Sequence, residues 1–400
     1  MRPFAERLSV VAPSITLAMN ARAADLKAKG VDVFSFGVGE PDFDPPKFVL
    51  DAAKAAIDAG CSKYTAVSGI APLKEAIAAF CKERRGFEVT PANIIVGVGA
   101  KHVLFNLALA LYEAGDEVII PAPYWVSYPE QVRMVGATPV VVVTTEESGF
   151  RLSPAQLEAA LTPKTKAIVL CTPSNPTGSA YSRAELEGLA AVLRKHDCYI
   201  IVDEIYAELV YDGFEHVSFA ALAPDMKDRI IVVDGVSKTW AMTGWRIGWA
   251  IAHPKLIKAI DTIHGQSTTN PTAVAQHAAK AALAGPIGVV TEMRDAFQKR
   301  RNVMVDGLNA LPGVTCRMPE GAFYAFADVR GLYGIKGPKG VLANDEDVAG
   351  WLLDVAHVSG VPGSGFGAPG YLRLSYASSE ERIRGALSSI ATCIAQAERV

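Results

Sequence analysis

The chain has 400 residues, of which 50% are hydrophobic and 20% are charged, and its formal net charge at pH 7 is −3. A chain of this length exceeds the size at which one hydrophobic core stops growing, so two structural units are expected. The composition is typical of a soluble globular protein, and no run concentrates Lys and Arg, so nucleic acid and anionic membranes are not expected as partners.

The N-terminus and the cysteines indicate the compartment. The first 14 residues contain no apolar core long enough for a signal peptide, and no stretch approaches the ~20 apolar residues of a membrane-spanning helix. Six cysteines are scattered without a C-x-x-C pair, which is typical of buried free thiols rather than of a disulfide framework. We therefore expect a cytoplasmic protein and no bound metal.

The first two-thirds of the chain predict an α/β sheet. Residues 14–29 are expected to form a helix that ends at Gly30. Between about 92 and 252, short apolar runs alternate with longer amphipathic segments. These runs are IIVGV, EVIIP, TPVVVV, AIVLC, YIIVD, IIVVD and GWAIA. Buried β-rich runs that alternate with helices predict a mostly parallel sheet covered by helices.

The pattern changes after about residue 285, where a long helical stretch begins. Two short strands are expected at 323–329 and 371–377, with another helix and the loop SGVPGSGFG between them. The segment from residue 378 predicts a final helix, with Ser378 as its cap and Glu381 completing a capping box. The C-terminal third is therefore expected to form a smaller α+β unit.

A lysine and an arginine follow the run IIVVD. Lys238 is predicted to lie in a small-residue loop, GVSKT, from which it can reach the crevice at the strand ends, where α/β sheets bind ligands. A desolvated lysine near other cations has a lowered pKa and can form a Schiff base, although a solvated loop lysine is the alternative. Arg246, in the apolar stretch TGWRIGW, needs an anion, which is either a phosphate or an internal carboxylate.

The segment VGVGAKHVLFNL joins a strand to a helix through Gly97 and Gly99, and the helix starts near Ala100 and Lys101. Glycines at such a turn let backbone N–H groups approach an anion that the helix dipole also favours. A purely structural role of the glycines is the alternative. The spacing is neither a dinucleotide fingerprint nor a P-loop, which disfavours a nicotinamide oxidoreductase.

Other candidates lie near predicted strand ends. Asp203 ends YIIVD, where a buried carboxylate needs a partner, and Tyr206 follows three residues later. A structural or metal-binding aspartate fits the same pattern. Asn175 follows AIVLC and offers an amide or an Asx turn, whereas Trp125 offers a flat face or a core aromatic ring. Arg373, within YLRLSYA, could clamp a carboxylate or be a solvated strand arginine.

Taken in chain order, these segments resemble the class I aminotransferases, which are fold-type I pyridoxal phosphate enzymes, and especially their bacterial aspartate aminotransferase branch. The segments are PSITLAMNARAADLKAKG, FGVGEPDFDPP, YTAVSGI, VGVGAKHVLFNL, PAPYWVSYPE, TPSNPTG, VDEIY, SKTWAMTGWRIGW, QSTTNPT, PEGAFYAF and LRLSYA. The resemblance covers nearly the whole chain. It implies an N-terminal arm at 1–12, a small α+β domain made of 13–45 and 290–400, and a large domain at 46–289 with a mostly parallel seven-stranded sheet sandwiched by helices.

The resemblance also implies roles at a pyridoxal 5′-phosphate site. Lys238 matches the Schiff-base lysine and proton carrier, and Asp203 matches the partner of the pyridine nitrogen. Around the ring, Tyr206 and Asn175 match the side chains that bond the ring oxygen, and Trp125 matches the stacking aromatic. The remaining cofactor positions are Gly99, Ala100, Lys101, Ser237 and Arg246.

The substrate and the second subunit are implied in the same way. Arg373, assisted by Asn175 and the backbone at Gly39, matches the arginine that grips the substrate α-carboxylate. Tyr64 matches a tyrosine that reaches the phosphate of the neighbouring subunit, which implies a homodimer with shared sites. The reaction expected is ping-pong transamination between aspartate or glutamate and 2-oxoglutarate or oxaloacetate.

One departure bears on specificity. The animal and enterobacterial enzymes of the family hold the side-chain carboxylate with an arginine of the second subunit, and the matching stretch here, IHGQSTTNPT, has none. Lys101, with Ser14 and Thr16, is expected to bind the distal carboxylate of aspartate, glutamate or prephenate. A prephenate or broader-specificity aminotransferase and a lyase that uses the same cofactor remain alternatives. A DNA-binding regulator is not expected, since the sequence starts directly in the aminotransferase-like part.

Overall fold

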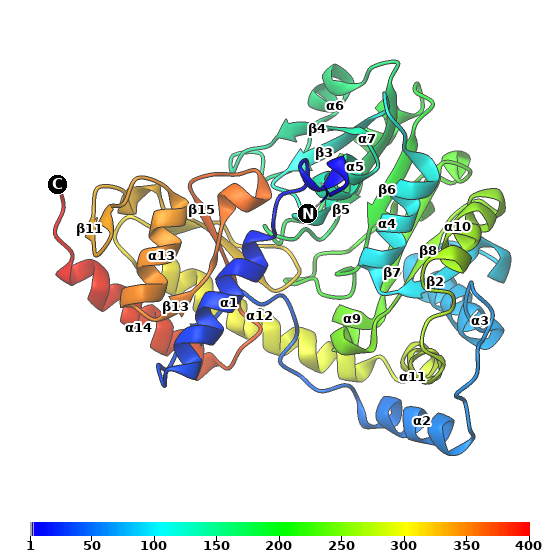
Figure 1. The fold of residues 1–400 in the computed structure, drawn as a ribbon, viewed down its shortest axis with the longest axis horizontal. Helices are drawn as coiled ribbons and strands as arrows, with labels where there is room; N and C mark the ends of the chain where they lie inside the picture. Colours follow the sequence, from blue (N-terminus) through cyan, green and yellow to red (C-terminus); the bar gives the residue numbers. More distant parts are fainter. Residues whose placement is uncertain (1, 3) are drawn as a thin grey trace.

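The structure is a computed structural model that describes Arg2 and residues 4–400. Its largest element is a seven-stranded sheet in the order β2-β8-β7-β6-β5-β3-β4 (Figure 1). The strands are β2 (Ile94–Val98), β3 (Glu117–Ala122), β4 (Thr138–Val143), β5 (Thr165–Cys171), β6 (Tyr199–Asp203), β7 (Ile230–Gly235) and β8 (Ile247–Ile251). β8 runs antiparallel to both neighbours, and the other pairs are parallel. The predicted mostly parallel sheet is confirmed, and its strands are the apolar runs of the sequence.

Helices cover both faces of this sheet. Successive residues of a strand point to opposite sides, so apolar strands expose apolar side chains on both faces, which the helices bury. In β6, Ile201 packs into one hydrophobic cluster, whereas Ile200 and Val202 pack into another. The Ile201 face carries α4 (Ala100–Leu111), α5 (Ser127–Met134) and α10 (Pro254–Gln266). The other face carries α2 (Lys47–Asp58), α3 (Ala71–Phe80), α6 (Pro154–Ala160), α7 (Arg183–Leu193), α8 (Phe219–Leu222) and α11 (Ala273–Ala284).

A smaller antiparallel sheet, in the order β14-β15-β10-β9, centres the unit on the left of Figure 1. Its strands are β9 (Thr315–Cys316), β10 (Tyr324–Asp328), β14 (Val361–Pro362) and β15 (Tyr371–Ser375). Beside it lie the parallel pair β1 (Phe34–Ser35) and β13 (Val358–Ser359), and the hairpin β11 (Lys336–Gly337) and β12 (Gly340–Val341). Helices α1 (Ile15–Ala28), α13 (Asp345–Val355) and α14 (Glu380–Gln396) share its core. The predicted smaller α+β unit is confirmed.

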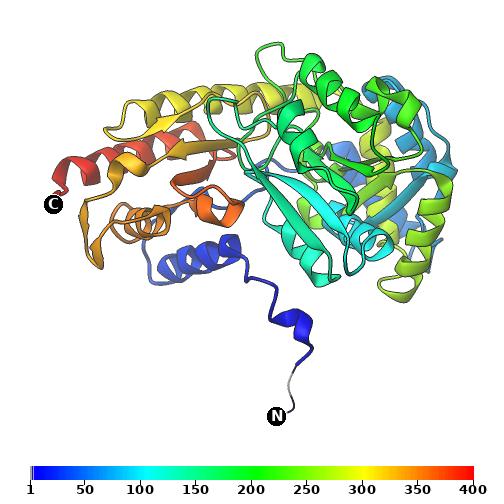
Figure 2. The ribbon, with the colours of Figure 1, turned by 90° about the horizontal axis from the view of Figure 1, so that it is seen from above.

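The long helix α12 (Gly288–Asn309) connects the two units (Figure 2). Val290, near its start, packs in the core of the large sheet, and Met293 and Phe297 pack in the core of the small unit. At the N-terminal end, the N–H of Ala12 donates a hydrogen bond of 2.8 Å to Glu130 of α5. Positions 1 and 3 of the predicted N-terminal arm lie outside the described residues.

Short helical segments complete the described chain. They are η1 (Glu6–Leu8), η2 (Cys81–Arg85, a π-helix), η3 (Pro91–Asn93), η4 (Pro224–Met226), α9 (Val236–Thr239), η5 (Thr243–Trp245), η6 (Arg330–Leu332) and η7 (Gly363–Phe366). None of the helices in the described part of the chain is both long and apolar enough to cross a membrane.

Two local predictions are wrong. The cap of α14 is Ser379, whose hydroxyl accepts a hydrogen bond from the N–H of Arg382, and not Ser378. Ser379 has the extended backbone of an N-cap, with φ −63° and ψ 149°, so Glu381 is not at the third helical position that a capping box needs. Lys238 lies in the short helix α9 rather than in a loop.

Candidate active site

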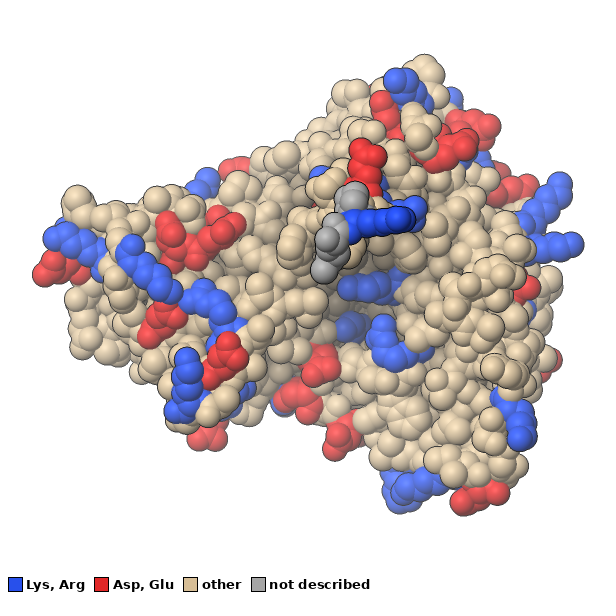
Figure 3. All heavy atoms as spheres, in the orientation of Figure 1, with Lys and Arg blue, Asp and Glu red and all other residues tan. Residues whose placement is uncertain are grey.

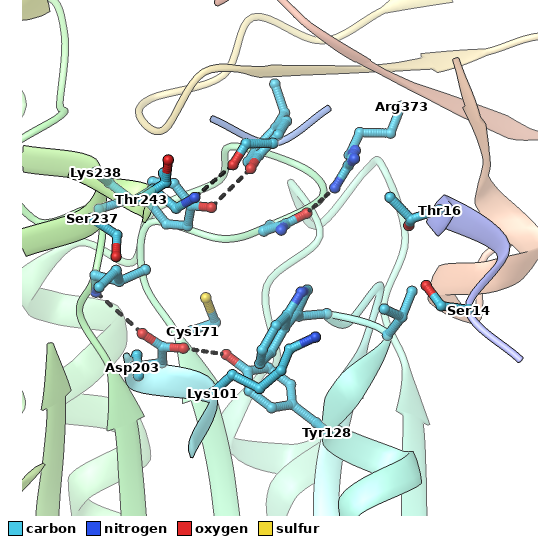
Figure 4. A pocket seen from close by; sticks show the side chains of 18 of the residues that line it. Ser14, Thr16, Lys101, Tyr128, Cys171, Asp203, Ser237, Lys238, Thr243 and Arg373 are labelled. Carbon is cyan, nitrogen blue, oxygen red and sulfur yellow. Dashed lines mark hydrogen bonds between the residues drawn. The ribbon is translucent and has the colours of Figure 1, made fainter. Parts of the chain in front are cut away.

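A cavity of about 360 Å³ opens where the carboxyl ends of β5, β6 and β7 meet the small unit (Figure 4). Loops that follow neighbouring parallel strands converge at this edge, which is where α/β sheets bind ligands. All the site residues predicted from the sequence line this cavity, except Gly99 and Tyr64. They are Ser14, Thr16, Gly39, Ala100, Lys101, Trp125, Asn175, Asp203, Tyr206, Ser237, Lys238, Arg246 and Arg373.

Lys238 enters the cavity from α9, directly after β7. Its Nζ donates a hydrogen bond of 2.5 Å to the carbonyl oxygen of Gly39. Burial lowers the pKa of Lys238 to about 8; the Glu40 charge opposes this shift, and the Arg373 and Arg246 charges add to it. A substantial fraction of the amine is therefore unprotonated at mildly alkaline pH, as a nucleophilic lysine requires.

Asp203 ends β6 and is only 4% exposed. The Tyr128 hydroxyl donates a hydrogen bond of 2.8 Å to Oδ2, and the N–H of Ile205 donates one of 3.2 Å to Oδ1. Burial raises the pKa of Asp203 to about 6, although these two donors lower it. Within the described chain, the carboxylate has donors but no salt bridge.

Arg373 projects from β15 into the cavity and is 2% exposed, so the alternative of a solvated strand arginine is wrong. Nη1 donates a hydrogen bond of 2.8 Å to Oδ1 of Asn175, and Nη2 donates one of 2.7 Å to the carbonyl oxygen of Gly37. Its Nε is buried and has no hydrogen-bond partner among the described residues. Arg373 therefore uses two of its five N–H donors within the protein and keeps the others, including the buried Nε–H, for an anion, which matches carboxylate binding.

Tyr206 lies on the turn after β6, and its hydroxyl is 2.8 Å from the hydroxyl of Tyr324. The amide oxygen of Asn175 accepts its hydrogen bond from Arg373. Both Tyr206 and Asn175 border the same cavity as Lys238, so they are near the position expected for a cofactor ring.

A second group of residues surrounds the N-terminus of α4. Gly99 caps this helix with a φ of 85°, a left-handed conformation that favours glycine, and Ala100 is its first residue. A Cβ at Gly99 would lie 2.6 Å from Nη2 of Arg246, so the guanidinium rests directly against the glycine. Arg246 donates hydrogen bonds to the carbonyl oxygens of Thr243 and Val98, at 3.0 and 3.4 Å, and none to a carboxylate in the described chain.

This arrangement favours a phosphate over an internal ion pair. Figure 3 shows Lys and Arg side chains in the hollowed centre of one face of the molecule. The exposed backbone N–H groups of the first helical turn and a neighbouring guanidinium are the donors that phosphate sites in proteins use.

Lys101 lies on the opposite side of the cavity from Arg373 (Figure 4). Its Nζ is 4.9 Å from the centre of the Trp125 ring, and burial lowers the pKa of Lys101, with a further contribution from Arg246. Ser14 and Thr16 line the same cavity from the start of α1, where the Ser14 hydroxyl also accepts a hydrogen bond of 3.4 Å from the N–H of Leu17.

Comparison with known proteins assigns the family. A model of the family described as aminotransferase class I and II matches residues 31–390. The chain belongs to this family.

Named relatives and a solved structure agree over almost the full length. The aspartate aminotransferase of Geobacillus stearothermophilus is 47% identical over 386 residues, which cover 96% of this chain and 97% of the relative. The aspartate/prephenate aminotransferase of Cereibacter sphaeroides is 47% identical over 387 residues, with the same coverage. The crystal structure of the aspartate aminotransferase of Rhizobium meliloti superposes with a TM-score of 0.95 at 44% identity and covers 100% of both chains.

Tyr64, predicted from the sequence as a site residue, lies away from the cavity of its own chain. Its side chain is 90% exposed, and it does not line the cavity of Lys238. The expected contact with a second subunit requires such an exposed position.

Two side chains that line this cavity, Tyr128 and Tyr324, were not identified from the sequence. Tyr128 donates to Asp203 from 75 residues away, and Tyr324 bonds Tyr206 from 118 residues away. The aromatic residues in PYWVSY and AFYAF were visible as a signal, but neither spacing identifies a partner so far along the chain. Among the described residues, no group of three or more His, Cys, Asp or Glu side chains is placed to hold a metal ion.

Proposed function

We propose that this chain is a pyridoxal-phosphate-dependent aminotransferase that transfers the amino group of aspartate or glutamate to a 2-oxo acid by a ping-pong reaction. The observation that carries the proposal is the convergence of Lys238, Asp203, Arg246 and Arg373 on one cavity. Each supplies what one part of the chemistry needs: a nucleophilic amine, a buried carboxylate, a phosphate ligand and a carboxylate ligand.

The residues present fit pyridoxal phosphate. Asp203 is a buried carboxylate with a raised pKa, and a protonated ring nitrogen would supply the cation that it lacks. The turn at Gly99 presents the first N–H groups of α4 beside the unpaired guanidinium of Arg246, as a phosphate would require. Trp125 offers a flat ring at the same cavity, and Tyr206 offers a hydroxyl donor. Ala100, Lys101 and Ser237 complete the proposed cofactor contacts.

The side chains divide the chemical work. When bound, pyridoxal phosphate supplies an aldehyde that receives the amino group and a ring that withdraws electrons from the substrate Cα. Arg373, with Asn175, binds the α-carboxylate and so directs the Cα–H bond towards Lys238. Nζ of Lys238 takes the Cα proton, and its lowered pKa suits a base that works near neutral pH. Release of one oxo acid before the next binds gives two half-reactions.

We assign the preference for a dicarboxylic substrate to Lys101, assisted by Ser14 and Thr16. The Lys101 amine borders the cavity, forms no salt bridge among the described side chains, and lies across the cavity from Arg373. Two cations on opposite sides suit a molecule with a carboxylate at each end. The names of relatives, aspartate aminotransferase and aspartate/prephenate aminotransferase, support an acidic substrate and keep prephenate as the alternative.

We further propose a homodimer with shared sites and the domain limits 1–12, 13–45 with 290–400, and 46–289. The dimer is supported by large apolar side chains at the surface, among them Tyr64 at 90% and Leu17 at 69% exposure. The boundary near residue 290 is supported by the change of hydrophobic core between Val290 and Met293. The six cysteines are all unpaired, which suits the proposed cytoplasmic location.

A half-reaction screen tests the proposal. The purified protein is loaded with pyridoxal phosphate, one amino acid is added at a time, and the visible absorbance of the cofactor is followed. We expect fast conversion of the cofactor to its amine form with aspartate and glutamate. In Lys238→Ala we expect no absorbance from cofactor bound covalently to a lysine. Conversion only by alanine or aromatic amino acids would contradict the substrate assignment. Formation of pyruvate and ammonia from serine or cysteine would favour the lyase alternative.

A further inference from the structure

Tyr324 stands between the residue proposed to bind the cofactor ring and the residue proposed to bind the substrate. It lies on β10, pairs with Ser375 of β15, and is fully buried. Its hydroxyl is 2.8 Å from that of Tyr206, and its ring lies 4.6 Å from the guanidinium carbon of Arg373. A Cβ at Gly39 would lie 2.6 Å from the Tyr324 oxygen, so the hydroxyl also touches the loop that accepts from Lys238.

Only one choice of donor and acceptor in the Tyr206–Tyr324 hydroxyl pair leaves Tyr206 able to donate to the cofactor ring oxygen. In a bond between two hydroxyls, one donates its only proton and the other accepts. If Tyr206 donated to Tyr324, it would have no proton left for an oxygen of the cofactor ring. The Tyr324 hydroxyl has no other hydrogen-bond partner in the described part of the chain, so its proton is available for Tyr206.

The ring has a separate contact. The guanidinium carbon of Arg373 lies 4.6 Å from the centre of the Tyr324 ring and 5.0 Å from the centre of the Phe366 ring. A cation placed over an aromatic face is attracted by it, more strongly where water is excluded. The two rings therefore fix the plane in which Arg373 presents its donors, while Asn175 and Gly37 hold two of its nitrogens.

We propose that Tyr324 is a positioning residue for both the cofactor and the substrate. Its hydroxyl directs the Tyr206 proton towards the cofactor ring oxygen, and its ring orients Arg373 for the substrate carboxylate. This inference rests on the proposed function. It separates into two parts, because phenylalanine removes the hydroxyl and keeps the ring.

The hydroxyl part is tested by pH titration of the visible absorbance of the bound cofactor in wild type, Tyr324→Phe, Tyr206→Phe and the double variant. A hydrogen bond donated to the ring oxygen stabilises its negative charge, so weakening that bond raises the titration midpoint. We expect Tyr324→Phe to raise the midpoint by about 0.5–1 pH unit. Tyr206→Phe should raise it at least as much, and Tyr324→Phe should add nothing in the Tyr206→Phe background.

Tyr376→Phe is the matched control. Tyr376 is also fully buried in the small unit, but its hydroxyl donates to the carbonyl oxygen of Ala322 at 3.3 Å. Its loss should leave the midpoint unchanged. A midpoint that does not move in Tyr324→Phe, or a shift that adds in full to that of Tyr206→Phe, would overturn the hydroxyl part.

The ring part is tested by the Kd of a non-reactive dicarboxylate such as succinate. Tyr324→Phe should keep the wild-type Kd, whereas Tyr324→Leu should raise it about tenfold. Tyr324→Met serves in its place if the leucine variant does not fold. An equal Kd in all folded variants would overturn the ring part. Failure of the wild type to form any Lys-linked absorbance would overturn the proposed function itself, which is a different result from an unshifted variant.

Discussion

Asp203 and Glu204 are consecutive in the sequence, yet their carboxylates lie on opposite faces of the large sheet. Asp203 faces the cavity, where burial raises its pKa to about 6. Glu204 is fully buried under the other face, and burial alone would raise its pKa as well. His216, Arg85 and Ser218 outweigh that effect, so the pKa of Glu204 lies below its usual value.

The two faces of the sheet differ in whether the chain itself supplies a salt-bridge partner for each buried charge. Under the Glu204 face, Arg85 at the end of η2 lies 2.5 Å from Glu208, 3.0 Å from Asp234 and 3.8 Å from Glu204. On the cavity face, four cations form no salt bridge with a carboxylate in the described part of the chain; they are Lys101, Lys238, Arg246 and Arg373. The chain itself neutralises the buried carboxylates of the Glu204 face, whereas the cations of the cavity face have no salt-bridge partner among the described residues, as the proposed anionic ligands require.

The largest effect is expected on the paired face. Arg85→Met removes the cation that three buried carboxylates share and leaves Asp234 with no salt-bridge partner among the described residues, so we expect the free energy of unfolding to fall by about 3–5 kcal/mol. Urea unfolding of the cofactor-free protein measures it. Arg84→Met is the control, because Arg84 binds the same Glu208 at 2.6 Å but is 44% exposed, and its loss should change stability by less than about 1 kcal/mol. Equal losses in the two variants would contradict the comparison.

Asp203→Asn should raise the free energy of unfolding, whereas Arg85→Met should lower it. The pKa of Asp203, about 6, lies above its ordinary 3.8, so the ionised form destabilises the folded chain increasingly as pH rises from about 4 to above 6. This difference corresponds to about 3 kcal/mol at most. We expect the variant without cofactor to gain about 1–3 kcal/mol at pH 8 and little at pH 4. Its affinity for pyridoxal phosphate should fall at least about tenfold.

Glu204→Gln is the matched change one residue along the chain. Because Glu204 is paired with Arg85 and His216, the neutral glutamine should lower the free energy of unfolding at pH 8 rather than raise it. If both variants shifted stability in the same direction, the two faces would not differ as described.

The sequence predicted the strands and most lining residues for a physical reason. Runs such as YIIVD are buried on both sides and are bounded by loops, so their ends and the residues that follow them are visible in the pattern. Lys238 and Asn175 follow such runs and Asp203 ends one, and parallel strands bring their ends together. Helix caps are less certain, because Ser378 and Ser379 are both able to cap and only the backbone conformation chooses between them.

Contacts between distant segments could not be predicted in this way. Arg85 looks like one of several charges in CKERRG, a pattern typical of a solvated surface, yet it is buried against Glu208, 123 residues away. Tyr128 and Tyr324 likewise follow no spacing rule that names Asp203 or Tyr206 as their partner. Such pairs depend on how the helices pack over the sheet, which periodicity does not encode.

Lys101→Ser removes one of the open cations on the cavity face. A charge-assisted contact to a carboxylate contributes about 1.5–3 kcal/mol, so the KM for aspartate should rise by about 10- to 100-fold. The KM for a monocarboxylic amino acid such as alanine should stay within about twofold, since its only carboxylate binds Arg373. Steady-state kinetics with both substrates measure the difference. An unchanged KM for aspartate would remove Lys101 from the substrate site.

Glu40→Gln should have the smallest effect, because Glu40 is exposed and its charge is screened. The Glu40 charge raises the pKa of Lys238, so its loss should lower that pKa below about 8. The pH midpoint for capture of pyridoxal phosphate by the cofactor-free protein should then fall by about 0.3–0.5 units in low salt and by less in 1 M salt. Gln keeps the acceptor for the Thr243 hydroxyl, and Asp42→Asn, whose carboxylate binds Arg300, is the control. A midpoint that stays constant in Glu40→Gln would mean that burial, the two arginines and Asp203 set the pKa of Lys238 without a contribution from Glu40.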